Sequence, residues 1–299
     1  MVSVKISDND YLQFVNDGFL PLGKVVTDEE LAALNARLDD IMLGKVQYGD
    51  KLLMQLDPNN TSNPTSTAPT SAANEYSAYK AINVEVNGQS VGFKGASLGY
   101  RKIGEAEAGL ECDPLFLNCM QKPLFRSICD RVYGAHAPIG VYRAMVMAKP
   151  ANDLGGGTPL PWHQDGGDWW ALDRDPLCFI WIALSPATKE NGAVQVVKGS
   201  HKLGLLSKRG HTLSAEHIKQ LVDDNPTNVL DMELKPGEAV LCHNFLVHRS
   251  GINTTAQARR GFSVNYIDGR TKVLNPKPEL AGSLGTPGGS FPIVFPSPF

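Results

Sequence analysis

The sequence predicts a mainly β protein with flanking helices, in the double-stranded β-helix class (jelly roll, cupin-like). From residue 139 onward, short apolar segments alternate with turns that contain glycine or proline, as the strands of an antiparallel sandwich do. Within the first 133 residues, two segments instead carry apolar side chains at helical spacing. No internal repeat divides the chain, so we expect one domain over residues 1–299.

The helices are expected before residue 134. Thr27 and Glu30 form a capping box, and apolar residues follow at helical spacing until Gly44. A second helix is expected over residues 113–133, where large apolar side chains recur with the same period. Strands are expected over residues 141–149, 178–184, 193–197, 229–234, 238–242 and 262–267.

Two segments are expected to be irregular. Residues 57–74 are dominated by Pro, Asn, Ser, Thr and Ala, which predicts a flexible polar loop, either a lid over the site or a surface insertion. The Pro- and Gly-rich tail near residues 270–299 is expected to run extended over the surface or toward a partner.

Composition restricts the function classes. The chain has 299 residues, 42% of them hydrophobic and 20% charged, which is enough to bury a full core. A net charge of −3 argues against a nucleic-acid partner, which requires a basic face. The sequence shows neither an apolar leader nor an 18-residue apolar run, so no membrane span is expected. Five cysteines without a C-x-x-C pair favour reduced thiols and a cytoplasmic location.

The motif that points to chemistry is His163-x-Asp165. Strand side chains alternate between faces, so these two side chains share one face. His248, from a distant segment, would complete two imidazoles and one carboxylate, a set that leaves metal positions open and is typical of non-haem Fe(II) oxygenases. Because His-x-Asp also arises by chance, the motif alone does not establish a metal site.

An arginine strengthens the metal interpretation. Arg259 lies eleven residues after His248 at the start of an expected strand, and Ser250 lies between them. A planar guanidinium suits a bidentate grip on the carboxylate of a keto-acid near a metal. The alternative is a solvated arginine pair, Arg259 and Arg260, at a strand start.

The surrounding segments resemble the phytanoyl-CoA dioxygenase family of Fe(II)/2-oxoglutarate oxygenases. The similarity extends in order over residues 8–270. The segments that carry it are WHQD at 162–165, FIWIAL at 179–184, ENGA at 190–193, KGSH at 198–201, PGE at 236–238 and SGIN at 250–253.

The resemblance implies a complete set of site residues and cofactors. Fe(II), 2-oxoglutarate and O2 are expected, with succinate and CO2 as products. The iron ligands would be His163, Asp165 and His248. The residues expected to contact 2-oxoglutarate are Arg259 at its distal carboxylate, Ser250, Trp181, Gln164, Met145 and Lys102. Arg260 replaces Arg259 if the strand register slips by one residue.

A set of three residues that closely follows the motif gives the one indication of how a substrate binds. Asp168, Trp169 and Trp170 closely follow Asp165 and are expected at the pocket mouth, where indoles stack on rings and attract cations. The alternative is core packing with a turn residue.

The expected reaction is hydroxylation of an unactivated C–H bond in a small-molecule metabolite or natural product. Asp165 disfavours halogenation, since halogenating relatives replace this carboxylate with a small residue. Desaturation, cyclisation, epimerisation and an acyl-CoA substrate stay open. From other classes, a zinc hydrolase or a non-catalytic jelly-roll binding protein also stays open. The oligomeric state is not determined by the sequence.

Overall fold

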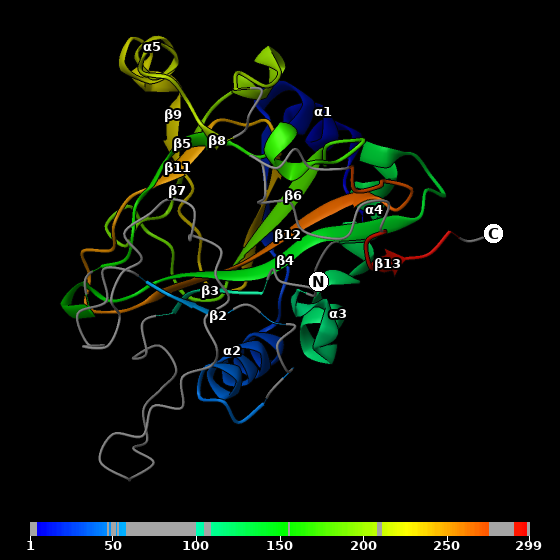
Figure 1. Ribbon diagram of the computed structural model, residues 1–299, viewed down its shortest axis with the longest axis vertical. Coiled ribbons are helices and arrows are strands. Elements are labelled where there is room, and N and C mark those ends of the chain that lie inside the picture. Colours follow the sequence, from blue (N-terminus) through cyan, green and yellow to red (C-terminus); the bar gives the residue numbers. More distant parts are fainter. Residues whose placement is uncertain are drawn as a thin grey trace.

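The computed structural model describes residues 5–46, 48, 52, 54–57, 100–104, 109–154, 156–207, 211–274 and 290–297. Within them, two antiparallel sheets form a double-stranded β-helix with helices packed against the larger sheet (Figure 1). This arrangement confirms the predicted fold class.

The larger sheet has the strand order β1-β10-β6-β12-β4-β3-β2, with β13 also pairing with β4. Its long central strands β6, β12 and β4 run through the middle of Figure 1. The bounds of its strands are β1 (Phe19–Lys24), β2 (Met54–Leu56), β3 (Tyr100–Ile103), β4 (Ile139–Lys149), β6 (Cys178–Ala183), β10 (Glu238–His243), β12 (Arg259–Asp268) and β13 (Ile293–Phe295).

The smaller sheet has the order β8-β5-β11-β7-β9. Each of its strands is short, and the sheet is built from segments far apart in the chain. The bounds of its strands are β5 (Leu160–Gln164), β7 (Val194–Val197), β8 (His211–Thr212), β9 (Val229–Asp231) and β11 (His248–Ser250).

Alternation along the strands gives the larger sheet two different faces. Phe262 and Ile180 point to the outer face and belong to the core shared with the helices. Phe179 and Trp181 point to the inner face and pack in a second core with Val196 of the smaller sheet. The inner face is therefore where side chains from both sheets meet.

Helices α1 to α4 cover the outer face of the larger sheet, whereas α5 packs against a cluster of the smaller sheet. No helix among the described residues is long and apolar enough to cross a bilayer. Short 3-10 turns connect several strands. The helix bounds are α1 (Asp8–Asp17), α2 (Asp28–Met42), α3 (Pro114–Met120), α4 (Pro123–Tyr133), α5 (Ala215–Ile218) with a π-helical continuation (Lys219–Asp223), and 3-10 turns at Leu110–Cys112, Asn152–Leu154, Asp168–Trp170, Ser200–Leu203 and Pro226–Asn228.

The first expected helix is confirmed and the second is corrected. The Thr27 hydroxyl accepts from Glu30 N at 3.2 Å, and the Glu30 carboxylate accepts from Thr27 N at 2.9 Å, so the capping box begins α2 as predicted. The single helix expected over residues 113–133 is wrong, because the chain forms α3 and α4 with a break before Pro123. Proline disfavours the helical conformation in the residue before it, and Lys122 is extended, with φ −60° and ψ 140°.

Every expected strand segment contains a strand, with shifts at the ends. β12 begins at Arg259, where the late strand was expected to start, and β9 ends at Asp231, three residues earlier than predicted. Strand β1, which pairs with β10, was not among the expected strands.

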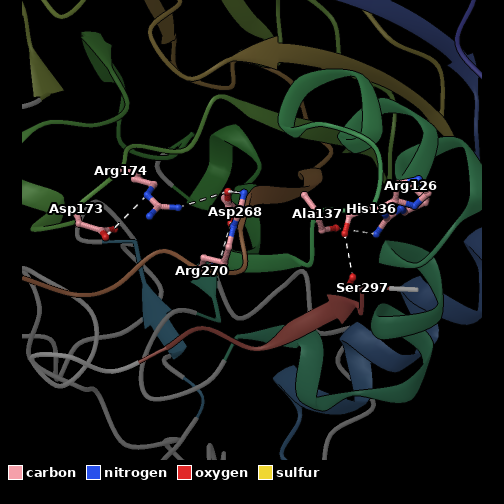
Figure 2. Close-up of polar contacts among 8 residues, drawn as sticks. All are labelled: Arg126, His136, Ala137, Asp173, Arg174, Asp268, Arg270 and Ser297. Carbon is pink, nitrogen blue, oxygen red and sulfur yellow. Dashed lines mark hydrogen bonds and ion pairs between the residues drawn. The ribbon is translucent and has the colours of Figure 1, made fainter. Parts of the chain in front are cut away.

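The two segments expected to be irregular are only partly described. Residues 58–74 lie outside the described residues, but Asp57 is buried and accepts from Thr158 N at 2.7 Å and Thr158 Oγ1 at 2.9 Å. In the tail, residues 290–297 are described, and β13 adds to β4 with Val294 2% exposed. Figure 2 shows Ser297 donating to the carbonyl of His136 at 3.1 Å. This part of the tail is therefore extended and paired with the sheet, whereas residues 275–289 lie outside the described residues.

The outer-face core gives a stability prediction. Phe262 is fully buried and packs edge-to-face on Phe116, with ring centroids 4.9 Å apart. Phe262→Ala is expected to lower the free energy of unfolding by about 3–5 kcal/mol, because it removes buried apolar surface and leaves a cavity. Leu12→Ala, at an exposed position, is the control. Equal denaturation midpoints for the two variants would contradict this packing.

Candidate metal centre

Three potential ligands converge between the sheets. One ligand atom from each of His163, Asp165 and His248 lies within 4.8 Å of the others. His163 on β5 stands directly opposite His248 on β11, and their ring centroids are 4.1 Å apart. Asp165 Oδ1 lies 4.0 Å from His163 Nε2. Within the described residues, this is the one cluster of histidine, cysteine or acidic side chains with metal-binding geometry.

Backbone contacts orient both imidazoles. His163 Nδ1 lies 2.8 Å from the carbonyl of Pro161, and His248 Nδ1 lies 2.8 Å from the carbonyl of Leu246. A carbonyl only accepts hydrogen bonds, so each Nδ1 carries the proton and each Nε2 carries the lone pair that a metal binds. The set therefore offers two nitrogens and one carboxylate, which suits a transition metal with open positions.

Arg259 lies on the inner face at the start of β12. Its side chain is 3% exposed, and its guanidinium carbon lies 5.3 Å from the Trp181 ring centroid. Burial lowers the pKa of Arg259 to about 10, so it is a cation at neutral pH. Among the described residues, Arg259 Nε, Arg259 Nη1 and Ser250 Oγ have no hydrogen-bond partner. Buried donors of this kind fit a carboxylate ligand.

The side chain of Arg260 instead contacts helix α2. Its Nη2 lies 2.6 Å from Asp39 Oδ1, and its Nη1 donates to Asn35 Oδ1 at 3.3 Å, both on α2. The alternative register, with Arg260 in the site, is thus not the one observed.

The strand register places further predicted contacts on the inner face. Ser263 on β12 stands between Trp181 on β6 and Met145 on β4. Lys102 on β3 stands opposite Met147, two residues further along β4. Trp181, Met145 and Lys102 therefore share one face with Arg259, as strand alternation requires.

The predicted role of Gln164 is corrected by its contacts. Its Nε2 donates to the carbonyls of Gly204 at 2.8 Å and Phe245 at 2.7 Å, and its Oε1 accepts from Leu206 N at 2.8 Å. Adjacent strand residues point to opposite faces, so Gln164 turns away from His163. Its amide fastens two loops in place of the predicted contact with 2-oxoglutarate.

The predicted position of Trp170 at the pocket mouth is also corrected. It is fully buried and stacks on Tyr142, with ring centroids 4.4 Å apart, so it is a core residue and not part of a pocket mouth. Asp168 is exposed in the same loop. The side chain of Trp169 lies outside the described residues.

Two neighbours of the site were not predicted. The Phe179 ring lies 5.7 Å from the His248 ring. A Cβ built on Gly261 would lie 2.0 Å from Cζ2 of Trp181, so a side chain at this position would collide with the indole. An isolated glycine within a strand pattern indicates such close approach, and this feature of the sequence could have identified Gly261.

Comparison with known proteins gives a family match over most of the chain. The family model described as phytanoyl-CoA dioxygenase (PhyH) matches residues 14–261. The chain is similar to the phytanoyl-CoA dioxygenase domain-containing protein 1 of Danio rerio, with 25% identity over 97% of this chain and 99% of that protein. It is also similar to the phytanoyl-CoA dioxygenase of Arabidopsis thaliana, with 23% identity over 85% of this chain and 86% of that protein.

Solved structures share the fold. EctD from S. alaskensis with bound Fe has a TM-score of 0.64 at 17% identity, covering 96% of this chain and 87% of EctD. The α-ketoglutarate-dependent carbocyclase SnoK from nogalamycin biosynthesis has a TM-score of 0.61 at 18% identity, covering 97% of this chain and 96% of SnoK. At these identities the likeness concerns the fold.

The contact between Gly261 and Trp181 gives a prediction. Gly261→Ala is expected to lower the free energy of unfolding by about 1–3 kcal/mol and to displace the indole from Arg259, because the pocket has no room for a methyl group. Denaturation and near-ultraviolet circular dichroism measure the two effects. Gly251→Ala is the control, since a Cβ there meets nothing within 4 Å. An unchanged indole spectrum in Gly261→Ala would contradict the placement of Trp181.

Proposed function

Because this chain belongs to the phytanoyl-CoA dioxygenase family, whose model spans residues 14–261, we propose that it uses Fe(II), 2-oxoglutarate and O2 to oxidise a C–H bond of a small-molecule metabolite. The observation that carries the proposal is the convergence of His163, Asp165 and His248 within 4.8 Å on a fold shared with 2-oxoglutarate-dependent enzymes.

The three side chains suit a resident iron. Two imidazole nitrogens and one carboxylate would hold the metal and would leave coordination positions for a keto-acid and O2. Bound there, iron and 2-oxoglutarate supply the oxidising power that activates a C–H bond while 2-oxoglutarate is converted to succinate and CO2. The carbonyls of Pro161 and Leu246 hold both rings in the ligating tautomer.

The co-substrate would be held by the first residues of β12 and their neighbours. Arg259 would receive the distal carboxylate of 2-oxoglutarate on its buried donors, and Ser250 would add its hydroxyl. Trp181 packs beside this guanidinium and keeps water from it. Met145 and Lys102 are proposed to line the same face.

The proposed outcome is hydroxylation. Other outcomes of the same chemistry are the second candidate, since related folds include a carbocyclase (SnoK) and an epimerase (SnoN). A zinc hydrolase would give no purpose to the buried donors of Arg259. The five cysteines are unpaired thiols, which supports a reducing, cytoplasmic setting.

Arg259 gives the first test of this function. Arg259→Gln is expected to raise the KM for 2-oxoglutarate about 10- to 100-fold, because a hydrogen-bonded charge pair contributes about 1.5–3 kcal/mol. Succinate release measures the effect. Arg260→Gln, which loosens the contact with α2, is the matched control and should keep the KM. Equal KM values in wild type and Arg259→Gln would refute the assignment.

The metal ligands give the second test. His163→Ala is expected to remove most of the iron that the folded protein retains, because one of its three ligands is gone. Metal content after anaerobic loading with Fe(II) measures this, with circular dichroism as the check on folding. His217→Ala, on α5, is the control. Full iron occupancy in His163→Ala would place the metal elsewhere.

A further inference from the structure

An asparagine lies near the metal ligands on the inner face of the larger sheet. Asn265 on β12 stands directly opposite Phe179 on β6, and side chains that are directly opposite on neighbouring strands share one face. The centroid of the Phe179 ring lies 5.7 Å from that of the His248 ring. Asn265 is therefore next to a side chain that neighbours a metal ligand.

The side-chain amide of Asn265 is buried, and its donor is unpaired. Asn265 is 2% exposed, and its Nδ2 has no hydrogen-bond partner among the described residues. A buried amide donor without an acceptor destabilises a folded protein, and such groups are rare. A ligand that places an oxygen atom beside Phe179 would supply the missing acceptor.

A second buried asparagine is joined to the segment that carries the metal ligands. Asn244 follows β10 and is fully buried, and neither Nδ2 nor Oδ1 has a hydrogen-bond partner in the part of the chain that the structure describes. Its backbone carbonyl accepts from Asp165 N at 3.0 Å, and its backbone N–H donates to the carbonyl of Leu177 at 3.4 Å. Leu177 lies two residues before Phe179, so Asn244 and Asn265 lie on the two sides of the same end of β6.

A buried asparagine with a structural role has different contacts in this fold. Asn253 is fully buried, and its Nδ2 donates to the carbonyls of Pro150 at 2.9 Å and Gln257 at 2.7 Å. The amide of Asn253 thereby fastens two segments of the chain. The unpaired atoms of Asn244 and Asn265 make no such contact within the described ranges, so an internal structural role does not account for them.

The two amides indicate an uncharged ligand that both donates and accepts hydrogen bonds. A carboxamide offers two donors on nitrogen and an acceptor on oxygen, and it carries no charge. Because Asn244 Oδ1 is unpaired as well as Nδ2, a matching ligand brings a donor in addition to an acceptor. A carboxylate brings acceptors only. A plain alkyl chain would leave both amides unpaired, and sites built to form hydrogen bonds reject such ligands.

The spacing of the asparagines suits a ligand with polar groups on opposite sides. β10 and β12 are the two neighbours of β6, so these strands lie about 10 Å apart across the sheet. A ligand held by both asparagines would bridge that distance together with the two side chains. Polar groups at its opposite edges would then meet one amide each.

We propose that Asn265 and Asn244 bind uncharged amide or hydroxyl groups of the organic substrate beside Phe179. Asn265 donates to one oxygen of the substrate, and Asn244 forms a paired contact through its donor and its acceptor. The inference rests on the proposed function and narrows it to a neutral, hydrogen-bonding substrate. A plain alkyl chain is thereby disfavoured as the part of the substrate that lies near the metal ligands.

The test uses cyclic diglycine as the probe, a neutral six-membered ring that carries an amide group on each of two opposite sides. Piperazine is the counterpart, because it keeps the ring and lacks both carbonyl oxygens. The full-length protein is loaded anaerobically with Fe(II) and saturating 2-oxoglutarate, and NMR line broadening of the probe protons gives the Kd. Cyclic diglycine is expected to bind saturably, and piperazine is expected not to bind.

Variants of the two asparagines are expected to weaken this binding. Asn265→Leu and Asn244→Leu should each raise the Kd of cyclic diglycine at least about threefold, because each removes hydrogen bonds to the probe. Asn9→Leu, at an exposed position of α1, is the control and should keep the Kd.

The stability of the ligand-free protein separates a binding role from a structural one. Asn265→Leu removes an unpaired buried amide and should leave the Tm equal to that of wild type or higher. Asn253→Leu removes paired donors and should lower the Tm. Asn265→Ala adds no volume, so it guards against overpacking by leucine. If both Asn265 variants lower the Tm as far as Asn253→Leu does, Asn265 is structural and the inference is overturned.

The binding measurements overturn the inference in three further ways. Wild type does not bind cyclic diglycine, piperazine binds equally well, or either Asn265→Leu or Asn244→Leu keeps the wild-type Kd. Loss of bound 2-oxoglutarate on adding cyclic diglycine would overturn it too, since the probe would then occupy the site of the co-substrate. If Fe(II) and 2-oxoglutarate do not bind wild type at all, the proposed function fails instead.

Discussion

The pairing of β5 with β11 is the constraint on which the site depends. It sets His163 directly opposite His248, with ring centroids 4.1 Å apart. Val196 on β7 fixes the other side of His248, so the short strand β11 is held in register from both sides. A slip of one residue would turn one imidazole to the opposite face and separate the ligands.

Buried positive charge is the second organising feature of the inner face. Strand side chains alternate between faces, so the two adjacent arginines point in opposite directions. Arg260 forms an ion pair with Asp39 of α2, whereas Arg259 is buried and two of its nitrogens have no hydrogen-bond partner among the described residues. Loss of hydration lowers the pKa of Arg259, which means that the fold bears an electrostatic cost in the absence of an anion. An anion bound at Arg259 would offset that cost.

The parts of the molecule that follow local rules could be predicted from the sequence. Strands β4, β6, β7, β9, β10 and β12, the capped helix α2 and the convergence of the three potential ligands follow from periodicity, from capping and from a short motif. The break between α3 and α4 could have been predicted only from the effect of Pro123 on the backbone of the residue before it. The roles of Gln164 and Trp170 depend on which loop each side chain meets, and strand β13 depends on an edge of β4 that is distant in sequence. Such contacts are set by tertiary packing.

One iron is proposed to bind at His163, Asp165 and His248 together with 2-oxoglutarate. Anaerobic visible absorbance tests it most directly, by adding Fe(II) to the apo-protein and then 2-oxoglutarate. A new metal-to-ligand charge-transfer band is expected, which saturates at one iron per chain and is absent from His163→Ala. A folded wild-type protein that binds Fe(II) and 2-oxoglutarate without this band, or that binds neither, would contradict it.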